Sequence, residues 1–118
     1  MSGDDRGAAT VWAASIVAVL ICVAAFTFRI GAAVTARHHT EAAADLAALA
    51  AASSAADGPG AACERARQVA ARMSVSLLTC RWVRGDALVE VRSELSGHLA
   101  AVGQAEARAR AGPVDRPP

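Results

Sequence analysis

Residues 8–28 read AATVWAASIVAVLICVAAFTF and contain no charged side chain. At about 1.5 Å per residue, a helix over this stretch extends about 30 Å, which matches the hydrocarbon core of a bilayer. A helix also satisfies its backbone hydrogen bonds internally, as lipid requires. The sequence therefore predicts a transmembrane helix over residues 8–28, preceded by a short charged leader over residues 1–7.

The apolar segment is only moderately hydrophobic, because many of its residues are alanine. Its larger side chains favour insertion by roughly 3 to 5 kcal/mol in total. Small residues also let helices approach closely, so the segment is suited to another helix as well as to lipid. We expect Ala14 and Ala18, one helical turn apart, to contribute to such helix packing.

The composition leaves room for one small domain outside the membrane. The chain has 118 residues, a net charge of +1 and only 3% aromatic residues, and its arginines alternate with acidic side chains. This pattern lacks the basic and aromatic surface typical of nucleic-acid binding. Neither a nucleophile motif nor a phosphate loop is found, so we predict no enzyme and no cofactor.

Helical character continues behind the apolar segment over residues 29–56, which we interpret as a stem. Arg37, Glu41 and Asp45 recur every four residues on one face. Leu46 and Leu49 lie on the opposite, apolar face, which needs a partner. His38 shares the polar face with the two acids, but without ligands from a second helix we interpret this set as solvated and predict no metal site.

A small head is predicted over residues 57–111. The sequence DGPG at 57–60 ends the stem, and Asp57 is the expected cap of a second helix that runs to about Ser74. The head should therefore begin with a helix whose apolar side covers another element.

A β-hairpin is expected after this helix, because the hydrophobic period changes to two. One strand presents Leu78, Cys80 and Trp82 on one face, and Gly85-Asp86 provides the turn. The returning strand presents a second apolar set, which comprises Val89, Val91 and Leu95.

Alternating alanines at 104–112 predict a third strand, with a helix from Leu99 to Arg110 as the alternative. Residues 112–118 are expected to form a disordered tail. The predicted fold class is α+β, with a long amino-terminal transmembrane helix, a stem, and a second helix packed on a small antiparallel sheet of two or three strands.

Two cysteines fall in the head and one, Cys22, falls in the apolar segment. A disulfide between Cys63 and Cys80 would stabilise a small core by roughly 3 kcal/mol in an oxidising compartment. Two free buried thiols are the alternative, because spacing alone does not establish a bridge.

The orientation signals of the chain conflict. Arg29 and Arg37 follow the span and favour a cytoplasmic carboxy-terminal side, whereas the short leader and the cysteine pair favour the opposite. We predict a single-pass protein of the cytoplasmic membrane with its amino terminus inside and its head outside.

Two pieces of the chain resemble the TadE/TadG-like proteins of tight-adherence pilus loci. The first is Arg6-Gly7 followed at once by the apolar span, and the second is RHHTEAAADLAALAAA at 37–52. The cysteine pair and the closing ARARAGP resemble a small actinobacterial TadE-like branch encoded beside secretion ATPases.

The resemblance implies a pilin-like assembly component, or pseudopilin, whose partners are the membrane and other pilin-like or secretion-system subunits, with a homo-oligomer as an open option. It also implies that Arg6, Gly7 and Ala8 form a processing site. The chain departs from the usual pattern at Trp12, where such sites commonly carry glutamate. Glu41, Asp45 and Leu46 belong to the signature stretch and would orient the stem against neighbours.

Two alternatives remain open. The chain could be a non-assembling, single-pass binding subunit or regulator of a secretion ATPase complex. It could also be a secreted protein whose apolar segment is a signal peptide cleaved after Val34-Thr35-Ala36, although the uncharged run is longer than a usual signal core.

Overall fold

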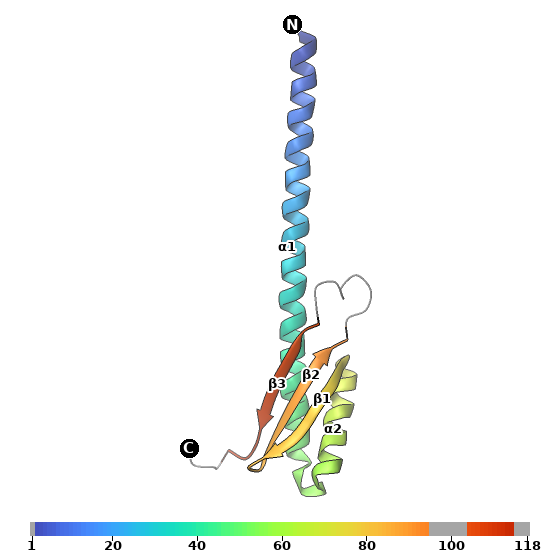
Figure 1. The fold of residues 1–118 in the computed structure, drawn as a ribbon, viewed down its shortest axis with the longest axis vertical. Helices are drawn as coiled ribbons and strands as arrows, with labels where there is room; N and C mark the ends of the chain where they lie inside the picture. Colours follow the sequence, from blue (N-terminus) through green and yellow to red (C-terminus); the bar gives the residue numbers. More distant parts are fainter. Residues whose placement is uncertain (1, 95–103, 115–118) are drawn as a thin grey trace. The chain divides into compact units, whose positions relative to one another are not determined.

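The computed structural model describes residues 2–94 and 104–114 (Figure 1). Two helices and three strands follow in chain order: α1 Ser2–Ser53, α2 Pro59–Arg72, β1 Val75–Val83, β2 Asp86–Ser93 and β3 Glu106–Ala111, with a short 3-10 helix at Ala55–Asp57. The strands form one antiparallel sheet in the order β1-β2-β3. The α+β fold predicted from the sequence is confirmed.

The chain divides into two compact units, Met1–Val34 and Thr35–Pro118. The first unit consists of the amino-terminal part of α1. The second unit contains the rest of α1, which we call the stem helix, together with α2 and the sheet.

The stem helix buries its small residues within the second unit. Thr40 and the alanines of this face are buried at helical spacing. They are Ala43, Ala44, Ala47, Ala48 and Ala51. The Thr40 hydroxyl donates to the Ala36 carbonyl at 2.8 Å, so its polar atom is satisfied inside the helix.

The start of α2 differs from the prediction at one residue. Gly58, with φ of 97°, is the N-cap, and no side chain caps the helix. Asp57 lies instead in the 3-10 helix, so its predicted role as the cap is wrong. Pro59 then fits the first helical turn, where its missing N–H costs nothing.

The hairpin is present, but its turn lies one residue earlier than predicted. Arg84 and Gly85 have φ of 54° and 85°, as a tight turn with two left-handed residues requires. Asp86 is already the first residue of β2 and pairs with Val83.

The inner face of β1 differs from the prediction because the strand contains a β-bulge. The register shifts between Leu77 and Thr79, which leaves Leu78 exposed. Leu77 packs on the core together with Cys80 and Trp82. Leu78 was predicted on this face, and the extra residue of the bulge is the reason that Leu77 replaces it. The predicted role of Leu95 lies outside the described residues.

The third strand is confirmed, and it pairs with β2 from Ala87↔Ala111 to Arg92↔Glu106. Its alanines face the core and its charged residues face outward, because successive side chains of a strand alternate between faces. The alternative helix is contradicted over Glu106–Arg110, and its beginning at Leu99 lies outside the described residues.

The core consists mostly of alanine and valine side chains from the stem helix, α2 and the sheet. Alanines of the stem helix and of α2 pack against Ala87, Val89 and Val91 of β2 and against the alanines of β3. Both helices therefore cover the same face of the sheet (Figure 1). Such small side chains let the helices approach the sheet closely, and His39 Nε2 adds a hydrogen bond to the Met73 carbonyl at 2.7 Å.

Candidate assembly surfaces

The first unit presents an unburied apolar surface. The large apolar side chains from Val11 to Val34 are exposed, with Trp12 at 71% and Phe28 at 77%. Within the described residues, α1 is the one helix long and apolar enough to cross a membrane, and no part of its most apolar window is buried. A surface of this size requires lipid or other helices around it.

The hydroxyl groups of this apolar segment are satisfied within the helix. Thr10 donates to the Arg6 carbonyl, Ser15 to the Val11 carbonyl and Thr27 to the Val23 carbonyl, at 2.8 to 2.9 Å. Polar groups in lipid are costly when they lack partners. These three residues are therefore compatible with a hydrocarbon environment.

The predicted packing and processing residues of the first unit lie along α1. Ala14 and Ala18 are exposed. Arg6, Gly7 and Ala8 are exposed residues of the same helix, and a Cβ built at Gly7 meets nothing within 4 Å. Neither the packing residues nor the processing residues are therefore covered by other described parts of the chain.

The stem helix separates a buried alanine face from an exposed face that carries the predicted signature residues. Leu46 and Leu49 are 46% and 59% exposed, and Asp45 is exposed as well. Glu41 accepts a hydrogen bond from Arg37 Nε at 3.3 Å. Leu49 follows Asp45 by one helical turn, so the prediction that the two leucines lie on the face opposite the charged residues is wrong, and the packed face is that of the alanines. The two leucines are not covered by the described part of the chain.

Sequence reasoning missed the alanine face, which forms the contact between the stem and the head. The repeat of small residues at positions 40, 43, 47 and 51 was the available signal. It was obscured because alanine also occupies exposed positions of the same stretch, such as Ala42.

The disulfide joins α2 to β1. Cys63 and Cys80 are bonded, with their Cα atoms 5.8 Å apart, and both side chains are partly buried. Cys22 is a free, exposed thiol in the first unit. The covalent bond holds α2 against the sheet.

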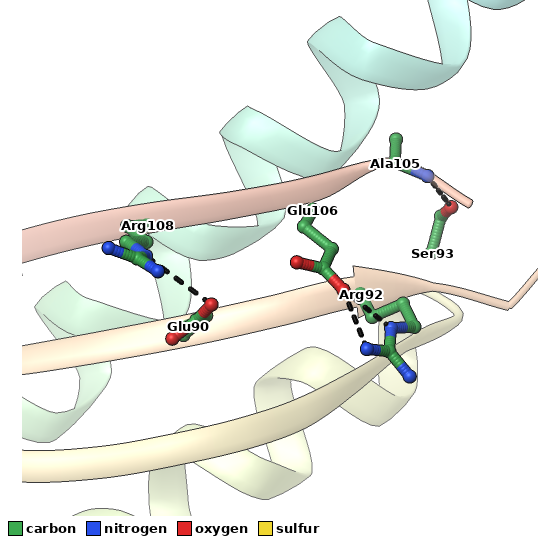
Figure 2. A network of polar contacts seen from close by, with 6 residues as sticks. All are labelled: Glu90, Arg92, Ser93, Ala105, Glu106 and Arg108. Carbon is green, nitrogen blue, oxygen red and sulfur yellow. Dashed lines mark hydrogen bonds and ion pairs between the residues drawn. The ribbon is translucent and has the colours of Figure 1, made fainter. Parts of the chain in front are cut away.

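The outer face of the sheet carries cross-strand ion pairs. Glu90 of β2 forms an ion pair with Arg108 of β3 at 3.3 Å, and Glu106 pairs with Arg92 at 2.6 Å (Figure 2). Beyond them, the Ala105 N–H donates to the Ser93 hydroxyl at 2.9 Å. The ion pairs tie β3 to β2 on the side away from the helices, and the hydroxyl of the buried Ser93 adds its contact on the core side.

A comparison with protein families places the amino-terminal part of the chain near pilus-assembly proteins. The family model described as "Putative Flp pilus-assembly TadE/G-like" matches residues 7–57. The matched region runs from Gly7 through the 3-10 helix, and it leaves α2 and the sheet unmatched. Searches of curated proteins and of solved structures return no match.

The family match supports the TadE-like resemblance of the first half of the chain. Together with the exposed apolar helix, it indicates a membrane-associated, single-pass component related to pilus assembly. Such a role is structural and does not require the chain to catalyse a reaction.

Proposed function

We propose that this chain is a TadE-like pseudopilin, a membrane-anchored assembly component of a tight-adherence pilus or related secretion system. The observation that carries the proposal is the unburied apolar segment at the start of α1, within the region that matches the pilus-assembly family. The narrower resemblance to actinobacterial TadE-like proteins encoded beside secretion ATPases belongs to this proposal.

In the proposed mechanism, the apolar helix is first held by lipid and then packs against helices of neighbouring subunits. Lipid tails and helix side chains are similarly apolar, so the exchange depends on close packing and not on a new hydrophobic gain. Ala14 and Ala18 lie one turn apart and are the small residues at which a second helix would approach.

We further propose that the amino terminus faces the cytoplasm and that the head faces an oxidising compartment. The Cys63–Cys80 bond supports this orientation, because disulfides persist mainly outside the cytoplasm. Labelling of intact cells with a membrane-impermeant thiol reagent, after mild reduction, tests it. The head thiols should react without cell lysis, and reaction only after lysis would reverse the orientation.

Processing between Gly7 and Ala8 is part of the proposal. The exposed leader residues would give a membrane peptidase access to that bond. Intact-mass measurement of the chain extracted from its native membrane should show Ala8 as the first residue. A chain that still begins at Met1 would remove this step.

The decisive experiment is co-purification of two differently tagged full-length copies from membranes. Ala14→Leu and Ala18→Leu should reduce recovery of the second copy, because the larger side chain keeps the helices apart. Ala13→Leu is the matched control, since Ala13 lies on another side of the helix and should leave recovery unchanged. Equal recovery for all variants would favour a non-assembling membrane anchor.

A further inference from the structure

Two grooves of opposite character adjoin on the second unit. The acidic groove lies between the stem helix and β3 and is lined by Glu41, Asp45, Glu90 and Glu106, with Arg37 and Arg108. The basic groove lies on the outer face of the sheet and is lined by Arg81, Arg108 and Arg110, with Glu90 and Leu88. Glu90 and Arg108, which form an ion pair (Figure 2), line both grooves.

Most charges in the acidic groove are neutralised within the chain. Glu41 pairs with Arg37, Glu106 with Arg92, and Glu90 with Arg108. Asp45 is exposed and has no ion pair or hydrogen bond from its side chain among the described residues. The acidic groove therefore retains one uncompensated carboxylate.

In the basic groove, too, most charges are paired within the chain, but the charge that is left unpaired is positive. Arg110 Nε donates to Asp86 at 2.6 Å, and Arg108 pairs with Glu90. Arg81 is exposed and has no such partner in the part of the chain that the structure describes. This groove therefore retains one uncompensated guanidinium group.

Each uncompensated charge lies beside leucine. Arg81 is directly opposite Leu88 across the β1–β2 ladder, and Arg110 is opposite Leu88 on the other side. Asp45 is one residue before the exposed Leu46 and one helical turn before the exposed Leu49. The two surfaces thus offer opposite charges and matching apolar patches.

The two charges of one chain lie at opposite edges of the sheet. Arg81 belongs to edge strand β1, whereas the groove of Asp45 lies beside edge strand β3, and the two side chains form no ion pair among the described residues. An Arg81–Asp45 contact therefore needs two copies. Because it joins different surfaces, it is a heterologous contact, and such contacts repeat from subunit to subunit to form rings or helical arrays.

We propose that Arg81 of one copy pairs with Asp45 of the next copy, with Leu88 packed against Leu49 of that neighbour. This inference rests on the proposed assembly function, and it adds a specific head-to-stem contact to the packing of membrane helices. A single exposed ion pair is weak by itself. Confinement of both copies in one membrane raises their effective concentration, so a weak pair suffices to set the register of subunits.

Charge reversal tests the contact on the full-length chain, by co-purification of two tagged copies from membranes. Arg81→Glu in every copy, and separately Asp45→Arg in every copy, should lower recovery of the partner by about threefold to tenfold, because each replaces attraction with repulsion. Combining the two reversals should restore recovery, since the pair is re-formed with its signs exchanged. Added salt should weaken the wild-type contact.

The matched control is Arg65→Glu, which reverses an exposed charge on α2 away from both grooves and should leave recovery unchanged. Loss of recovery in both single variants without rescue in the double variant would overturn the pairing. If Ala14→Leu lowers recovery and neither reversal does, the inference fails while the proposed function stands. If none of these variants lowers recovery, both fail.

Discussion

Arg84 holds a left-handed backbone conformation in the β1–β2 turn, with φ of 54°. Asparagine tolerates this conformation better than other residues with a Cβ, and Asn-Gly is the preferred pair for such turns. Arg84→Asn should therefore raise the free energy of unfolding by about 0.5 to 1 kcal/mol. Thermal unfolding of the full-length chain in detergent measures it. Arg84→Ala is the control and should not stabilise; a lower midpoint for Arg84→Asn than for wild type would contradict the assignment.

The Cys63–Cys80 bond closes a loop over a sequence separation of 17 residues. On the chain-entropy model, a loop of this size stabilises the folded state by about 3 kcal/mol. Replacing both cysteines by alanine should lower the denaturant midpoint of the head accordingly, as followed by Trp82 fluorescence in a Trp12→Phe background. Cys22→Ala should leave the midpoint unchanged, because Cys22 is a free and exposed thiol. Equal midpoints with and without the head cysteines would show that the bond adds no stability.

At the scale of elements, the stem helix depends on the size of its buried alanines. Ala47 is fully buried and packs in a cluster with Ala62 and Ala66 of α2. Ala47→Leu should destabilise the head by about 1 to 3 kcal/mol or more, because the larger side chain forces α2 away from the stem. Ala42→Leu makes the same chemical change at an exposed position of the same helix and should cost little. Denaturant unfolding of the two full-length variants compares their free energies of unfolding. Equal values would show that the alanine face of the stem helix is not closely packed.

The elements that the sequence predicted well have strong local signals. The end of the stem follows from Gly58 and Pro59, since both residues interrupt a helix. Strand β3 follows from the alternation of alanine with charged residues, which outweighs the helix propensity of alanine and arginine. In β3 the alternation also places every alanine on the core side, which a helix over the same residues would not do.

The features that the sequence did not predict depend on tertiary packing. The bulge that exchanges Leu77 for Leu78 has no local signature, because both residues are leucine. The buried face of the stem is likewise ambiguous, since alanine occupies most sides of that helix and only contact with α2 and the sheet selects one of them. The exposed charges of Asp45 and Arg81 become informative only when the structure shows which of their neighbours are already paired.

At the scale of the whole molecule, the two units carry different physical tasks. The apolar side chains of the first unit are exposed, whereas the second unit buries a core of small side chains and is closed by a disulfide. Retention in a membrane should therefore depend on the first unit, and resistance to unfolding on the second. Substitutions in one unit are expected to leave the other property unchanged.

Leu20 lies within the apolar segment of the first unit and is exposed. Arginine at the centre of a membrane span costs about 2.5 to 3.5 kcal/mol, and the loss of leucine adds roughly 0.5 kcal/mol. Since the whole segment favours insertion by only roughly 3 to 5 kcal/mol, Leu20→Arg should release a large fraction of the chain into the alkaline carbonate supernatant. Leu49→Arg, at an exposed position of the stem, introduces the same charge outside the span and should leave the chain in the pellet. Release of wild type under the same treatment would contradict membrane anchorage, and retention of Leu20→Arg alongside wild type would show that contacts other than insertion hold the chain.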